Sequence, residues 1–84
     1  MTSDEVRALV EQGIDGAEVH VQGDGDRFSI IAISDAFEGR RLVQQHQLVN
    51  ACLNDCIAAG DIHAVDIKTY TREAWETARR RGLI

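Results

Sequence analysis

Three histidines and two cysteines are the side chains of this 84-residue chain that could coordinate a transition metal: His20, His46, His63, Cys52 and Cys56. His63 is the main candidate because it is in phase with Val65 and Ile67 at the first residue of an expected strand, where the buried face meets solvent. An imidazole at such a point can present one nitrogen outward as a metal ligand. The alternative role is structural, with the ring closing the edge of the core through one hydrogen bond.

The other four side chains are expected to have structural roles. Cys52 and Cys56 lie four residues apart on one side of an expected helix, but two thiols alone are an incomplete metal site. Both adjoin an apolar stripe, so packing as free thiols is favoured over ligation. His46 lies on the same stripe and is expected at the core or its edge. His20 falls on the polar face of an expected strand and is interpreted as solvated.

A basic edge is the second kind of candidate site. The net charge of −5 speaks against a nucleic-acid partner, but acidic residues dominate before Gly39 and basic residues outnumber them after it. Arg40, Arg41 and Lys68 could together contact DNA. Against this, Glu38 in the preceding segment would repel a phosphate, and no exposed aromatic series indicates base stacking.

Enzyme chemistry is not expected. The sequence shows no nucleophile beside a base at a recognisable spacing, no phosphate-binding loop and no HExxH motif. A chain of this length forms one domain, residues 1–84, with a core too small for a large enclosed active site. There is no apolar run near 18 residues, so no membrane association is expected and the default compartment is the cytoplasm.

The elements that must position these residues can be read from hydrophobic periodicity and end signals. We expect, in chain order, a helix capped by Ser3 and ending near Gly13 as its C′ residue, strands over 17–21 and 28–34, a helix over 41–59, a strand over 62–68 and a helix capped by Thr71. The fold class is therefore α+β with the order α-β-β-α-β-α. The first two strands should form a hairpin with the second in the centre, and the long helix allows the third strand to pair in parallel. Helices packed on one face of this three-stranded mixed sheet are the natural arrangement.

Two stretches of the sequence have an order of residues that is more informative than their composition. The first runs FEGRRLVQQHQLVNA over 37–51, and the second runs IHAVDIKTYT over 62–71, followed by Trp75. Together they resemble the BolA family, whose members show an F-E-G segment, an R/Q-H-x-L-V helix and an I-H-A-x-x-I-K-T-Y/L-T ending. The segment GDGDRF over 23–28 looks like the hairpin of the IbaG-like acid-stress branch. The resemblance covers nearly the whole chain, from Glu18 to Trp75.

This resemblance implies a class II KH-like fold and a non-catalytic role in iron–sulfur homeostasis and stress response. BolA proteins pair with monothiol CGFS glutaredoxins and share a [2Fe-2S] cluster, and some act as DNA-binding transcription regulators. The chain is accordingly expected to be a cofactor-free monomer alone and a heterodimer with a glutaredoxin. His63 matches the histidine with which the family ligates the shared cluster.

At the position expected for a second cluster ligand, this chain departs from the family pattern. Family members often carry His or Cys just before the phenylalanine that begins the second strand, where this chain has Asp26 and Arg27. A charged guanidinium has no lone pair to donate, and Asp26 offers a hard oxygen where thiolate or imidazole is preferred. Asp26 could nevertheless serve, His20 or a water could substitute, or the glutaredoxin could be bound without full ligation.

Overall fold

The computed structural model describes residues 1–82, apart from the side chain of Asp24. Its elements are α1 (Ser3–Gly13), β1 (Glu18–Asp24), β2 (Arg27–Ile33), the 3₁₀ helix η1 (Asp35–Phe37), α2 (Leu42–Ala58), β3 (Ala64–Tyr70) and α3 (Arg72–Arg80). The expected α+β class and element order are confirmed. The third strand begins two residues later than predicted, so His63 precedes it instead of opening it.

The ends of the helices follow local capping chemistry. Thr2, and not Ser3 as predicted, caps α1, because the Thr2 hydroxyl accepts a hydrogen bond from the Glu5 N–H at 3.2 Å. Thr71 caps α3 as predicted, accepting from the Ala74 N–H at 3.2 Å. The predicted C′ role of Gly13 is wrong, since Gly13 is the last residue of α1 and Ile14 caps the helix in an extended conformation.

The three strands form one mixed sheet in the order β1-β2-β3. β1 and β2 are antiparallel, whereas β2 and β3 are parallel. The predicted hairpin, central second strand and parallel third strand are all confirmed. Gly23 has a φ of 124° and its position would bring a Cβ within 2.3 Å of the Arg27 carbonyl oxygen, so the hairpin closes only with glycine there.

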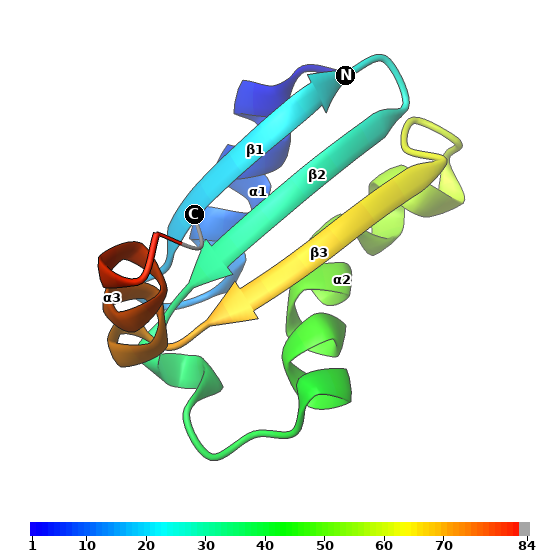
Figure 1. The fold of residues 1–84 in the computed structure, drawn as a ribbon. Coiled ribbons are helices and arrows are strands. Elements are labelled where there is room, and N and C mark those ends of the chain that lie inside the picture. Colours follow the sequence, from blue (N-terminus) through cyan, green and yellow to red (C-terminus); the bar gives the residue numbers. More distant parts are fainter. Residues whose placement is uncertain (83–84) are drawn as a thin grey trace.

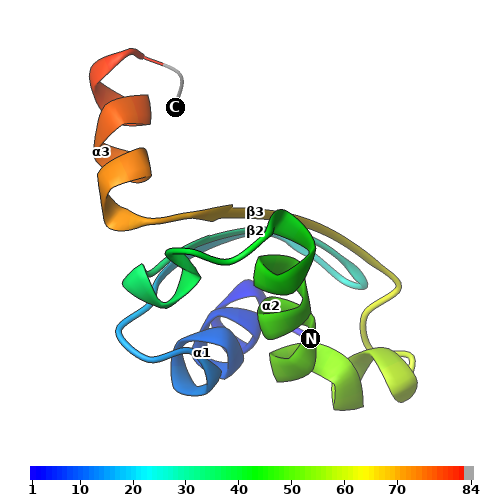
Figure 2. The ribbon, with the colours of Figure 1, turned by 90° about the horizontal axis from the view of Figure 1, so that it is seen from below.

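The core lies between one face of the sheet and the two helices α1 and α2 (Figures 1 and 2). It is built from apolar side chains of these elements: Val6, Val10, Phe28, Ile30, Ala32, Val49 and Leu53. The predicted apolar stripe of α2 is buried in its middle, but Leu42 at its start is 63% exposed and Ile57 near its end is also exposed. The middle of α2 therefore packs into the core while its ends leave it.

The third helix differs in placement. The expectation that the helices gather on one face holds for α1 and α2, whereas α3 leaves the end of β3 on the opposite side of the sheet (Figure 2). There Trp75 stacks on His20, with ring centroids 5.6 Å apart. Because His20 alternates with the buried Val19 along β1, its ring points away from the core face. In the part of the chain that the structure describes, no helix is long and apolar enough to cross a membrane.

Candidate metal-ligand site

The loop before β3 lies at one end of the sheet, beside the turn that joins β1 to β2 (Figure 1). His63 is the last residue of this loop. The backbone N–H groups of His63 and Ala64 both donate to the carbonyl oxygen of Asp26, at 2.8 and 3.1 Å. These two bonds attach the loop before β3 to the hairpin turn, although the segments are far apart in the sequence. We call this junction of turn and loop, with Asp26 and His63 at its centre, the rim.

At the rim the imidazole of His63 is exposed and oriented. Its Nδ1 lies 2.7 Å from Oδ2 of Asp26, and the two side chains are 65% and 52% exposed. The ring is therefore not sealed in the core. Among the described side chains, Asp24 not being one of them, no hydrogen-bond partner is found for its second nitrogen, Nε2. Gly60 lies near Nε2, since a Cβ built on Gly60 would be 3.8 Å from that atom.

The charge at the rim is set by the same pair. The hydrogen bond from His63 is the main cause that lowers the pKa of Asp26 below its ordinary value; partial desolvation opposes it, and the positive charges of His63 and Arg27 add to it. Asp26 is therefore ionised at neutral pH and can only accept hydrogen bonds. Because the carboxylate can only accept, Nδ1 of His63 carries the proton in this bond, and whenever the imidazole is neutral the lone pair is on Nε2.

The donor set of the rim is small. Its described pair is one imidazole and one carboxylate, and the carboxylate of Asp26 is already bonded to that imidazole. Among the residues whose side chains the structure describes, which leaves out Asp24, there is no group of three or more His, Cys, Asp or Glu side chains that could hold a metal ion. Stable transition-metal sites take about four ligands, so this pair alone is not a complete metal site.

His20 is not brought to the rim. It pairs with Ile31 in the sheet, four positions along β2 from Arg27, which pairs with Ala64 next to His63. Four residues of strand span roughly 13 Å. The Nε2 of His20 instead lies 2.8 Å from Oε2 of Glu18, and the ring stacks on Trp75, so this histidine is more constrained than a simply solvated one.

The cysteines have the environment of packed thiols. The Sγ of Cys52 donates to the Leu48 carbonyl at 3.3 Å, and burial raises the pKa of this thiol. A neutral thiol is a poor ligand and nucleophile. Cys56 is a free thiol that packs against the core. These surroundings support the packing role that the sequence favoured.

The predicted basic edge is divided between two parts of the fold. Arg40 and Arg41 lie in the loop before α2, where the Nε of Arg40 donates to the Ala36 carbonyl at 2.9 Å. Gln45 holds this loop, because its amide donates to the carbonyls of Phe37 and Arg40 at 3.1 and 3.0 Å. Lys68 is an exposed residue of β3. Nucleic-acid contact by these residues stays a prediction.

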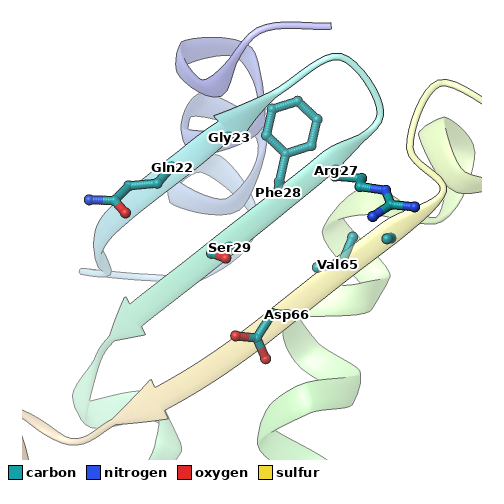
Figure 3. A pocket seen from close by; sticks show the side chains of 8 residues that line it. Gln22, Gly23, Arg27, Phe28, Ser29, Val65 and Asp66 are labelled. Atoms are coloured by element: carbon teal, nitrogen blue, oxygen red, sulfur yellow. The ribbon is translucent and has the colours of Figure 1, made fainter.

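Arg27 acquires a role that the sequence did not indicate. A shallow hollow of about 490 Å³ lies at this end of the sheet and is lined in part by Gln22, Ser29 and Asp66. Arg27 extends along it from β2 toward β3 (Figure 3). The sequence marked this position only as one that lacks a ligand. The structure shows that it places a positive charge beside the rim.

Comparisons with known proteins agree with this fold. The family model described as BolA-like protein matches residues 8–74. The acid stress protein IbaG of Escherichia coli K12 is 38% identical over 80 residues, covering 95% of each chain. An uncharacterized protein from the rpoN-murA intergenic region of Acinetobacter guillouiae is 37% identical over 82 residues, covering 98% of this chain and 99% of its own. The solved structure of a bolA homologue from Coxiella burnetii superimposes with a TM-score of 0.82 at 31% identity, covering 90% of this chain and 97% of that chain.

Proposed function

The chain belongs to the BolA-like protein family, and we propose that it is a non-enzymatic adaptor that binds a monothiol CGFS glutaredoxin and shares a [2Fe-2S] cluster with it. The similarity to an acid stress protein supports a role in stress response. The proposed compartment is the cytoplasm, where thiols such as Cys52 and Cys56 stay reduced.

The observation that carries this proposal is the oriented, exposed imidazole of His63. One nitrogen is occupied by Asp26 and the other is free to approach a metal centre on a partner's surface. A single donor is what a shared centre requires of this chain when the partner holds the remaining ligands. When bound, such a cluster would supply an electron-accepting centre, and a neutral imidazole in place of a thiolate removes negative charge from it and raises its reduction potential.

The missing second ligand is consistent with a one-donor role. Asp26 bonds to His63, and Arg27 cannot donate an electron pair. We infer that this chain contributes His63 alone and that the partner completes the coordination. The guanidinium of Arg27, beside the rim, would offset part of the negative charge of a thiolate-bound centre.

The test is a titration of a glutaredoxin carrying a reconstituted cluster with this protein, followed by visible circular dichroism. We expect the wild-type chain to change the spectrum and His63→Ala to abolish the change. His20→Ala is the matched control, because it removes an imidazole that lies away from the rim, and it should behave as wild type. An iron and sulfide assay of the purified complex measures how much cluster is retained.

Two outcomes would contradict the proposal. A spectrum that the wild-type protein leaves unchanged would mean that no cluster is shared. A change that persists in His63→Ala would mean that the donor is another group. DNA binding through Arg40, Arg41 and Lys68 stays the alternative, and it requires an affinity that falls steeply as salt is raised.

A further inference from the structure

We propose that Asp26 is a positioning residue, whose carboxylate holds the imidazole of His63 in the Nδ1–H tautomer and turns Nε2 outward as the donor atom. This inference rests on the proposed function for its purpose, but the tautomer itself is a property of the isolated chain. It assigns to Asp26 a role different from the direct metal ligation considered from the sequence.

Asp26 fixes His63 at two levels. Its backbone carbonyl accepts from the N–H groups of His63 and Ala64, which sets the path of the main chain. Its carboxylate then accepts from Nδ1 of the same histidine at 2.7 Å, a short, charge-assisted hydrogen bond. Because one residue holds both the backbone and the ring, the imidazole has a defined direction even though it is exposed.

The chemistry of the pair explains why this direction matters. A histidine that ligates through Nε2 must be neutral, with its proton on Nδ1. A carboxylate behind the ring selects that tautomer and raises the basicity of the ligating nitrogen, as in many metal sites. At the rim the free nitrogen faces Gly60, whose place has no side chain to block an approaching partner.

The second histidine–carboxylate pair of the sheet provides an internal control. His20 bonds to Glu18 through Nε2, the opposite nitrogen from that used by His63. The structure therefore assigns opposite tautomers to two imidazoles that each face a carboxylate. A single spectrum of one sample can report both.

The experiment is nitrogen NMR of the isolated chain labelled at its histidine rings, recorded near pH 8, above the ordinary histidine pKa of about 6.5. We expect His63 in the Nδ1–H form and His20 in the Nε2–H form. Asp26→Ala should shift His63 toward the Nε2–H form, which unconstrained imidazole favours in water, without altering His20. Glu18→Ala is the matched control and should leave His63 unchanged.

The fold is expected to survive Asp26→Ala, because the two backbone bonds at the rim use the carbonyl of residue 26 and not its side chain. Backbone amide spectra check this, and the isosteric Asp26→Asn is the second variant if they change. Asn keeps an acceptor but adds a donor, so it should leave a mixture of the two tautomers. An Nε2–H form of His63 in the wild type, or no change in either variant, would overturn the inference.

A second measurement distinguishes failure of this inference from failure of the proposed function. In the glutaredoxin titration, Asp26→Ala should bind with roughly tenfold weaker affinity or worse, as is typical when the residue behind a ligating histidine is removed. If the wild type does not perturb the cluster but shows the assigned tautomers, the proposed function fails and the role of Asp26 in setting the tautomer stands. If His63→Ala abolishes the perturbation while Asp26→Ala changes neither tautomer nor affinity, the inference alone fails.

Discussion

Among the residues whose burial the structure describes, Ser34 is a buried polar residue, with 1% of its surface exposed. Its hydroxyl donates to the Asp15 carbonyl at 3.0 Å and accepts from the Ala36 N–H at 3.1 Å. The hydroxyl thereby caps the first turn of η1 and links it to the loop that follows α1. A buried backbone group left without a partner costs more than the bond itself contributes.

We expect Ser34→Ala to lower the free energy of unfolding by about 1–3 kcal/mol. The substitution leaves the Asp15 carbonyl without its hydrogen-bond donor and removes the side chain that caps η1. Urea denaturation followed by far-UV circular dichroism measures the change. Ser29→Ala, at an exposed position of β2, the strand that ends just before Ser34, is the control and should stay within about 0.5 kcal/mol of wild type. Equal effects of the two substitutions would show that the hydrogen bonds of Ser34 contribute little.

At this scale the sequence predicted that His63, the candidate residue, lies where the sheet meets solvent, but it did not predict the side chain to which His63 bonds. His63 could be selected because its phase and its end-of-strand position are local properties. Its bond to Asp26 joins residues 37 apart and depends on the register between two strands, which no local pattern specifies. For the same reason the charge of Arg27 beside the rim was missed.

Between elements, α1 and α2 approach closely at Gly13. A Cβ at this position would lie 2.3 Å from the Sγ of Cys52 and 3.3 Å from its Cβ. Gly13 does not have a positive φ, so its lack of a side chain matters here for space and not for conformation. The distance between the two helices is therefore set by a glycine facing a cysteine.

We expect Gly13→Ala to destabilise the fold by about 1–3 kcal/mol through overpacking, although alanine is the better helix former. In a Cys52→Ala background the sulfur is absent, so the same substitution should cost at least about 1 kcal/mol less. A Cys56→Ala background is the control, and there the full cost should remain. Thermal and urea unfolding of the six proteins provide the comparison. Equal costs in all three backgrounds would refute this packing argument.

Most elements could be predicted because their signals are local: capping residues, turns and periodicity of two or 3.6 residues. The errors about which side chains are buried have tertiary causes. The sequence gives Leu42 and Ile57 the same phase as Val49 and Leu53, but only the middle of α2 faces α1 and the sheet. The two ends of α2 are exposed because they extend beyond the core. The periodicity of the sequence does not indicate how far the core extends.

For the whole molecule, the placement of α3 is the most consequential feature. Its described contacts with the rest of the chain are few: Trp75 stacks on His20 and meets Tyr70 edge-on at 5.3 Å, and Arg72 donates to the Gly16 carbonyl at 2.8 Å. Only Ala78 of this helix is buried. Ala74, Trp75 and Ala78 form one short apolar edge of this helix, and such an edge does not specify which face of the sheet the helix covers.

We expect α3 to open at lower denaturant concentration than the rest of the fold, because it buries little apolar surface. Trp75 is the only tryptophan, so its fluorescence reports this helix while far-UV circular dichroism reports mainly α1 and α2. Arg72→Ala should move the fluorescence transition further down and leave the main transition in place. Coincident transitions in both proteins would show that α3 unfolds together with the core.

The contact between the hairpin turn and the loop before β3 also links the proposed metal donor, His63, to folding. The pair that orients the imidazole closes a separation of 37 residues, so an unfolded or partly synthesised chain cannot present the ring in this way until β3 has joined β2. A centre that recognises the oriented ring binds the native state and not the denatured one, and mass action then raises the stability of the native state as the centre becomes more abundant. Under the proposed function, a larger supply of the cluster-bearing partner would therefore lower the fraction of this chain that is unfolded.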